Sequence, residues 1–316
     1  MSDDNPSPDK TDALTDILRT IRLNASAYFC SDFKSPWGMA IDYQPKGLFH
    51  VVVEGSCCLQ LDKKDTFITL EKGDIVAFPT GGGHVIRDSA SSAALPGAQV
   101  LSEISAGGNP FLPSAESADA SITLLCGSFQ YDWSVNHPFL KDLPCFIHIQ
   151  AKHSPELAWL RALLDVVALE LRQQSAGAAL MIDRLTEVLF IQLIRFHINH
   201  TGGGLGYITA LADKQIGIAL NHIHSEQGAH WTVERLGQTV AMSRTAFTEK
   251  FTKLVGMPPK NYLINWRMNK AKAYLQEGQK SMADIAQHAG YASEASFSKA
   301  FKQFFGDTPG SLRPKD

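Results

Sequence analysis

The sequence contains no uninterrupted stretch of apolar residues long enough for a membrane helix, although 44% of its 316 residues are hydrophobic. A helix that crosses a bilayer needs about 20 consecutive, mainly apolar residues. The first ten residues are polar and acidic, without the basic start and apolar stretch of a secretory signal. We therefore expect a cytoplasmic protein that has no membrane partner.

Several patterns that would indicate a particular chemistry are also missing. The five cysteines form no C-x-x-C pair, so neither a disulfide framework nor a cysteine zinc cluster is expected. The chain has no G-x-S-x-G nucleophile elbow, no phosphate-binding P-loop and no G-x-G-x-x-G turn. These absences favour a protein that is not an enzyme.

The overall charge of −3 conceals an uneven distribution along the chain. Residues 225–316 contain 13 Lys or Arg against 8 Asp or Glu, an excess of five positive charges, so the remaining residues carry −8. A basic carboxyl-terminal segment attached to an acidic body is typical of a nucleic-acid-binding module joined to another domain.

The amino-terminal half has the pattern of a β-structure. After an expected disordered tail at 1–12, short apolar runs alternate with turn residues from about residue 27 to 148, which predicts a β-sandwich or barrel. Residues 89–120, rich in Ser, Ala, Gly and Pro, are expected to form a long loop. We place a barrel-like domain at 13–150.

Two helices are expected next, at about 155–174 and 178–199. The second is apolar around most of its circumference, and such a helix must be buried. We therefore predict a dimerisation segment at 151–200, with packing on the chain's own barrel as the alternative. Three consecutive glycines begin a linker at 201–214.

An internal repeat defines the expected carboxyl-terminal domain at 215–316. Phe247, Phe251, Gly256 and Pro259 recur 50 residues later. In each copy a short amphipathic helix, a turn of small residues and a Ser cap precede a second helix, which predicts two helix-turn-helix units. A helix over 259–275 would connect them.

In the second copy, Gly290-Tyr291, Phe297, Phe301, Gly306 and Pro309 resemble the signature of the AraC family of transcription regulators. The resemblance covers both copies, over about residues 215–314. The resemblance implies that both second helices enter successive major grooves of DNA. The residues it places on those helices are Arg244, Thr245, Thr248, Glu249, Glu294, Ala295, Ser296 and Lys299. The candidate phosphate contacts are Lys250, Lys253, Arg267, Lys302 and Arg313.

The amino-terminal domain resembles the cupin-type sensor domain of some AraC-family members. Gly73, Pro79, Gly81 and His84 match the second half of a cupin motif, and His50 with Glu54 matches part of the first. Two imidazoles and one carboxylate could hold a divalent metal ion, so we predict His50, Glu54 and His84 as candidate metal ligands. Hydrogen bonding inside a barrel that holds no metal is the alternative.

We therefore expect an α+β protein with a cupin-like β-barrel, a middle helical pair and an all-α double helix-turn-helix domain. The predicted function is a sequence-specific DNA-binding transcription regulator that is controlled by a small-molecule effector in the barrel. Activation of transcription is the expected direction, and repression is the alternative. The predicted partners are double-stranded DNA, that effector, a second copy of the chain and RNA polymerase. The alternatives are a metal-dependent cupin enzyme fused to a DNA-binding domain and an architectural DNA-binding protein that responds to no ligand.

Overall fold

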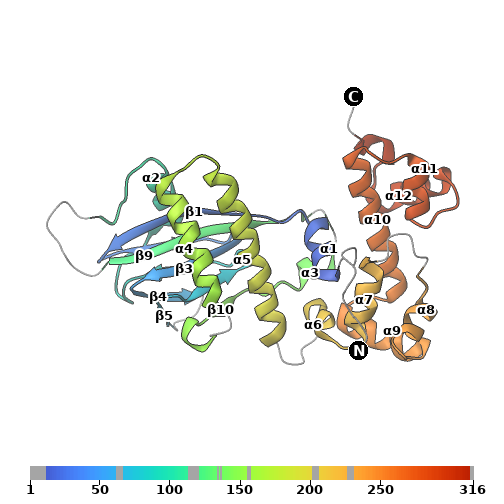
Figure 1. Ribbon diagram of the computed structural model, residues 1–316, viewed down its shortest axis with the longest axis horizontal. Helices are drawn as coiled ribbons and strands as arrows, with labels where there is room; N and C mark the ends of the chain where they lie inside the picture. The colour runs from blue at the N-terminus through green and yellow to red at the C-terminus, as the bar shows by residue number, and fades with distance from the viewer. Residues whose placement is uncertain are drawn as a thin grey trace, which may run out of the picture. The chain divides into compact units, whose positions relative to one another are not determined.

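The computed structural model describes residues 12–61, 67–112, 121–133, 135, 137–154, 158–200, 206–225 and 231–313 (Figure 1). The chain divides into two compact units. One, the barrel unit, comprises residues 23–131 and 143–197. The other, the helical unit, is assembled from residues 1–22, 132–142 and 198–316.

The barrel unit contains two five-stranded sheets. The first sheet has the strand order β1 (Asn24–Lys34), β9 (Ser121–Gln130), β3 (Gly47–Glu54), β6 (Ile75–Phe78) and β10 (Ile147–Ile149). The second has the order β5 (Phe67–Glu71), β4 (Ser56–Leu61), β7 (His84–Arg87), β2 (Gly38–Ile41) and β8 (Leu95–Pro96). Their facing sides enclose a core of buried apolar residues that includes Phe33, Trp37, Val52, Leu59 and Ile86.

The predicted β-rich domain and the α+β class are confirmed, with two differences. The long strand β1 has a weak signal in the sequence, because two of its buried positions are the small residues Ala25 and Ala27. The expected loop 89–120 contains β8 and the helix α2 (Gly97–Ser105). Val100 anchors that helix, since its side chain is fully buried in the barrel core, and a single buried residue in a helix of nine is a weak sequence signal.

Two helices, α4 (Ala158–Gln173) and α5 (Ala178–His200), follow β10 and the short 3₁₀ helix η1 (Ala151–His153). They cover the outer face of the first sheet (Figure 1). On that face the ring of Phe190 lies 4.8 Å from the ring of Phe129, and Phe129 stacks on Phe49. The apolar helix predicted at 178–199 is thus partly buried against its own barrel.

The helical unit contains the carboxyl-terminal helices and two segments from the amino-terminal half. Its carboxyl-terminal elements are α6 (Tyr207–Ala212), α7 (Ile216–Ser225), α8 (Val233–Thr239), α9 (Arg244–Val255), α10 (Pro259–Glu277), α11 (Met282–His288), α12 (Glu294–Phe305) and η3 (Pro309–Leu312). Helix α6 falls within the segment 201–214 that the sequence suggested as a linker. No helix of the described residues has the length and apolarity needed to cross a membrane.

The helices α1 (Ala13–Thr20) and α3 (Pro138–Lys141) belong to the helical unit although they precede and interrupt the barrel strands. The backbone nitrogen of Ala13 donates to Asn221 Oδ1 of α7 at 2.9 Å. Asp142, at the end of α3, accepts a hydrogen bond of 2.7 Å from the backbone nitrogen of Ile208 in α6. The stretch expected at 13–150 is therefore divided between the two units.

A buried polar network joins these segments to the first half of α10. His224 Nδ1 lies 3.2 Å from Asp16 Oδ2, and Lys270 contacts the other oxygen of the same carboxylate. The hydroxyl of Tyr262 lies 2.7 Å from His224 Nε2 and 3.1 Å from His137 Nε2. Side chains from α1, α3, α7 and α10 thus satisfy one another inside the unit, as buried polar groups must.

The His137 imidazole allows a prediction of pH dependence. Its Nδ1 accepts a hydrogen bond from the backbone nitrogen of Phe139, so the ring is neutral with its proton on Nε2. Burial holds the pKa of His137 well below its usual 6.5. As pH falls below 6.5, the unfolded chain gains a proton that the folded chain does not, and the helical unit loses about 1.4 kcal/mol of stability by pH 5.5.

The measurement is urea unfolding at pH 7.5 and 5.5, compared between the wild type and His137→Asn. Asparagine keeps an acceptor at this cap position but does not titrate. The neighbouring His224, whose pKa burial also lowers, stays in both proteins. We expect the loss on acidification to be about 1.4 kcal/mol smaller in the variant, and an equal loss in both would contradict the assignment.

Candidate nucleic-acid interface and barrel cavity

Both predicted helix-turn-helix units are present and are capped in the same way. Ser243 and Ser293 each begin a second helix, and their side chains accept hydrogen bonds from the backbone nitrogens three residues later. Gly256 and Gly306 end these helices in the left-handed conformation, where glycine carries no steric penalty. The repeat in the sequence therefore corresponds to a repeat in backbone geometry.

The helices α9 and α12 also have the same division between buried and exposed faces. Phe247 and Phe251 in α9, like Phe297 and Phe301 in α12, have no exposed surface. The predicted groove-facing side chains lie on the other side of each helix: Thr248 is half-buried and Arg244, Thr245, Glu249, Glu294, Ala295, Ser296 and Lys299 are exposed. Both helices thus present a short polar face to solvent.

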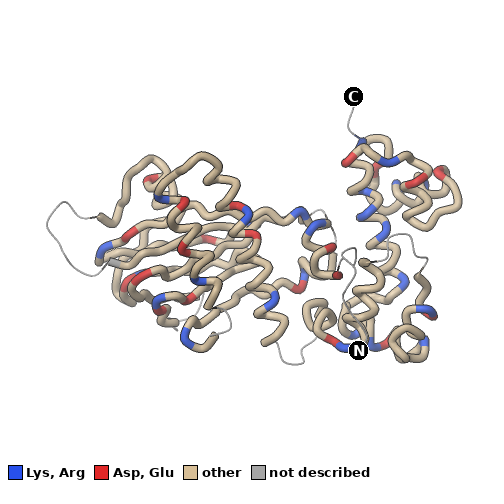
Figure 2. The backbone as a smooth tube through the Cα atoms, viewed as in Figure 1, with Lys and Arg blue, Asp and Glu red and all other residues tan. Residues whose placement is uncertain are grey.

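Basic residues recur along the connecting helix α10 (Figure 2). Of the predicted phosphate contacts, Lys253 and Lys302 are exposed. The other three are engaged within the helical unit. Lys250 pairs with Asp213 at 2.9 Å, Arg267 donates to the Trp231 carbonyl at 3.3 Å, and Arg313 donates to the Lys280 carbonyl. Their spacing in the sequence could not reveal these partners, which lie 33 to 37 residues away.

The two turns differ at one backbone position. Ala241 in the first turn has a φ of 55°, and the equivalent Gly290 in the second has a φ of 85°. A left-handed conformation costs an L-residue about 1 kcal/mol. Ala241→Gly should therefore stabilise the helical unit by up to about 1 kcal/mol, less the entropy that glycine adds to the unfolded chain.

Chemical denaturation of the wild type and the variant measures this effect. Ala246→Gly is the matched control, because Ala246 is exposed in the first turn of the helix α9, where glycine should destabilise by up to about 1 kcal/mol. Opposite signs for the two substitutions are expected. A destabilisation of similar size at both positions would contradict the conformational explanation.

Inside the barrel, three polar side chains form a chain of hydrogen bonds. His84 Nδ1 lies 2.8 Å from the Gly82 carbonyl, so it must donate, and its Nε2 must then accept from His50 Nε2 at 2.8 Å. His50 Nδ1 is left as an acceptor for the Cys126 thiol at 3.0 Å. Burial lowers the pKa of His84 to about 4 and raises that of Cys126, which keeps all three groups neutral.

The candidate metal ligand Glu54 does not join the two histidines. Its carboxylate is exposed and pairs with Lys72. Residues 50 and 54 would share one face of a regular strand, but the β3–β9 register shifts between Val52 and Glu54, and this bulge breaks the alternation. Every ring nitrogen of His50 and His84 is also occupied within the barrel.

The three predicted donors therefore do not fit a metal ion as arranged. Among the residues with described positions, no group of three or more His, Cys, Asp or Glu side chains is suited to hold one. The two histidines hydrogen-bond to each other instead.

A cavity of about 440 Å³ opens beside this hydrogen-bond chain. Its apolar lining includes Phe29, Met39, Ile41, Leu48 and Leu101. Its polar lining residues include Asp42, Gln44, Ser102 and Lys46. Lys46 Nζ donates to the Tyr28 hydroxyl at 2.8 Å, and that hydroxyl contacts Ser128. A mainly apolar concavity with a few oriented polar groups is the usual form of a small-molecule site.

Comparison with known proteins agrees with both halves of this description. Residues 12–199 match the family model described as Cupin, and residues 236–315 match the one described as Helix-turn-helix domain. The chain is 31% identical over 303 residues to the HTH-type transcriptional regulator AlkR of Acinetobacter baylyi, covering 96% of this chain and 99% of that protein. It is 27% identical over 305 residues to a putative AraC-like transcription regulator of Streptomyces lividans, covering 96% and 98%.

Proposed function

Because this chain belongs to the AraC family of transcription regulators, with an amino-terminal cupin domain, we propose that a small molecule in the barrel cavity controls its binding to DNA. The chain is a sequence-specific DNA-binding regulator. The observation that carries DNA binding is the repeated geometry of α9 and α12, which present equivalent polar faces on one unit. We place its action in the cytoplasm, because its relatives are proteins of bacteria, whose DNA lies there.

The exposed residues of α9 and α12 are assigned to two major grooves. Arg244, Thr245 and Glu249 read one groove, and Ser296 with Lys299 reads the next. The 19-residue helix α10 is about 28 Å long, comparable with the ~34 Å that separates successive major grooves on one DNA face. Lys253 and Lys302 contact phosphates.

Chain continuity supports a route from the cavity to the DNA-reading unit. Tyr28 and Phe29 of β1 and Cys126 and Gly127 of β9 line the cavity. These strands pair with each other from Asn24 and Gln130 onward. Directly before β1 and after β9 the chain enters the segments that pack on α7 and α10. A ligand that changes the β1–β9 pair therefore acts on the two segments that pack on α7 and α10. A coupling free energy of about 1–3 kcal/mol between ligand binding and DNA binding changes DNA occupancy about 5- to 150-fold.

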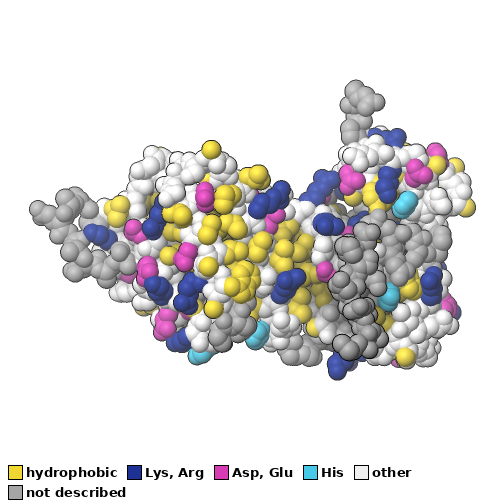
Figure 3. Space-filling model, viewed as in Figure 1, with side chains coloured by type: hydrophobic (Ala, Val, Ile, Leu, Met, Phe, Trp, Pro, Cys, Tyr) yellow, Lys and Arg dark blue, Asp and Glu magenta, His cyan; other side chains and the backbone are white. Residues whose placement is uncertain are grey.

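The outer face of α4 and α5 is assigned to dimerisation. Large apolar side chains there are exposed, and Figure 3 shows them as an apolar area over these helices. They are Trp159, Val166, Leu169, Leu180, Met181 and Val188. A contiguous apolar surface of this kind is typical of a protein interface, and a second copy of the chain is the occupant we propose.

DNA binding is tested by selecting a preferred site from random duplexes and titrating both that site and random DNA at several salt concentrations. Specific regulators bind their sites about 10³- to 10⁷-fold more tightly than random DNA. Thr245→Ala and Ser296→Ala should each lower the specific affinity and leave random binding unchanged. Equal affinity for selected and random DNA at every salt concentration would overturn the proposal.

Dimerisation is tested by sedimentation of the full chain and of the double variant Leu169→Asp/Leu180→Asp. The control is Leu112→Asp, because Leu112 is 52% exposed on another part of the barrel unit. We expect a dimer for the wild type and the control and a monomer for the double variant. A monomeric wild type, or a double variant that stays dimeric, would refute this interface.

A further inference from the structure

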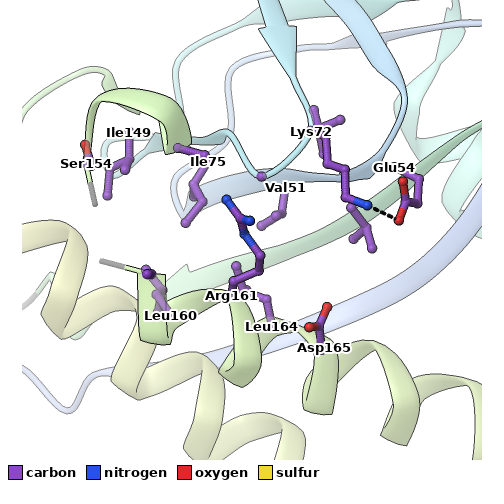
Figure 4. Close-up of a pocket in the computed structure, with 15 residues that line it drawn as sticks. Val51, Glu54, Lys72, Ile75, Ile149, Ser154, Leu160, Arg161, Leu164 and Asp165 are labelled. Atoms are coloured by element: carbon purple, nitrogen blue, oxygen red, sulfur yellow. Dashed lines mark hydrogen bonds and ion pairs between the residues drawn. The ribbon is translucent and has the colours of Figure 1, made fainter. Parts of the chain in front are cut away.

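A second cavity, of about 400 Å³, lies between the first sheet and the inner face of α4 (Figure 4). It shares no lining residue with the cavity inside the barrel. Its apolar walls are formed by Val51, Ile75, Ile149, Leu160 and Leu164. The volume is within the range of about 300–1,000 Å³ typical of small-molecule sites.

Four charged side chains line this cavity, and two of them neutralise each other. Lys72 forms an ion pair with Glu54 at one side (Figure 4). The other two, Arg161 and Asp165, have neither a hydrogen bond nor an ion pair within the described part of the chain. Both side chains are exposed to solvent, so the cavity offers one hydrated charge of each sign at its edge, beside an apolar wall.

Arg161 and Asp165 stand four residues apart on one helix and do not pair, in the order, cation first, that favours pairing less. Opposite charges at this spacing are neighbours and commonly pair. Here the Arg161 side chain extends toward the sheet instead, and its Nη2 lies 3.2 Å from the position that a Cβ would take on Gly73. Figure 4 shows the guanidinium between Ile75 and Val51, away from the Asp165 carboxylate. A gap thus separates the cation from the anion.

We propose that this cavity binds a free α-amino acid with an apolar side chain. The ligand carboxylate would accept hydrogen bonds from the Arg161 guanidinium, whose planar donors suit a carboxylate. Its ammonium group would donate to Asp165. Its side chain would lie against Val51, Ile75 and Ile149. A zwitterion can pair with both charges, whereas a simple carboxylate can pair with Arg161 alone.

The site is distinct from the other surfaces assigned to the barrel unit. The apolar residues of α4 in the proposed dimer interface, Trp159, Val166 and Leu169, do not line the cavity. At 100° per residue, Leu160 and Leu164 face the sheet, whereas Asp165 lies on the flank of the helix next to Leu169. Amino-acid binding is therefore measured both in the wild type and in the variant Leu169→Asp/Leu180→Asp, which separates it from dimerisation.

Isothermal titration of the full chain with L-leucine tests the proposal. Three related compounds identify the groups that are recognised: leucinamide lacks the carboxylate, 4-methylpentanoate lacks the ammonium group, and glycine lacks the side chain. We expect L-leucine to bind at least tenfold more tightly than each of them, since a hydrogen bond to a charged group changes affinity about 10- to 100-fold. Equal binding of 4-methylpentanoate would overturn the assignment to an amino acid, and no binding of any of the four would overturn the site.

Variants then locate the binding in this cavity. Arg161→Met and Asp165→Asn should each weaken L-leucine binding about 10- to 100-fold. Arg184→Met is the matched control, because Arg184 is exposed on α5 and pairs with Glu187 outside the cavity. Unchanged L-leucine affinity in both cavity variants would place the binding elsewhere and refute the proposal. Circular dichroism of each variant confirms that the fold is retained.

Discussion

Replacing Phe297 by alanine is expected to unfold the second helix-turn-helix and to remove half of the DNA interface. The Phe297 ring has no exposed surface and packs among Met268, Leu275, Ile285 and Phe301. Truncation of a fully buried phenylalanine costs about 3–5 kcal/mol. Since each good base contact contributes about 1–3 kcal/mol of discrimination, losing the contacts of α12 should lower specific DNA affinity at least about 100-fold.

The control for this prediction is Phe304→Ala in the same helix. Phe304 is 38% exposed, and a substitution at such a surface position changes stability by about 0.5 kcal/mol or little more. Chemical denaturation and titration of the selected DNA site measure both variants. If Phe297→Ala behaved like Phe304→Ala, the aromatic core of the repeat would not be the element that holds α12 in place.

Asp16→Ala is expected to destabilise the helical unit by about 3 kcal/mol or more. Asp16 is 3% exposed and holds both His224 and Lys270. Removing one member of a buried ion pair typically costs about 3–5 kcal/mol, because the remaining charge is left without a partner. The side chain of Lys270 is 21% exposed, and partial hydration of its ammonium group favours the lower end of that range.

Urea unfolding followed by tryptophan fluorescence measures this loss, because Trp231 and Trp266 lie in the helical unit. Asp12→Ala is the control. Asp12 caps the same helix α1 from an exposed position, and loss of a cap costs about 1 kcal/mol. Asp16→Ala should also weaken DNA binding, although residue 16 is far from α9 in the sequence. An effect no larger than that of Asp12→Ala would show that the network is not needed to hold α1.

The sequence predicted the features whose signals are local or repeated. Ser243 and Ser293, the aromatic pairs four residues apart and the terminal glycines define both helix-turn-helix units from spacing alone, and the short apolar runs predicted the barrel. Long stretches of helix-forming and apolar residues without glycine or an internal proline also located α4, α5 and α10.

Other features depend on contacts between residues that are distant in the sequence. Lys250 and Arg313 looked free to bind phosphate, but their partners, Asp213 and the Lys280 carbonyl, are set by tertiary packing. Glu54 has the spacing of a cupin ligand, yet a bulge in β3 turns it away from His50. The place of α1 in the helical unit depends on contacts with Asn221 and Lys270, and no periodic pattern in the sequence indicates them.

The discontinuous helical unit has a consequence for how such a chain can be recombined. Its segments at 12–22 and 132–142 are encoded on either side of strands that belong to the other unit. A chimera that joins residues 1–200 of one relative to residues 201–316 of another would bring a foreign Asp16 and His137 against Tyr262 and Lys270. Exchange of DNA specificity between relatives therefore requires that residues 12–22, 132–142 and 198–316 are transferred together. Otherwise only the solvent-facing positions of α9 and α12 should be changed.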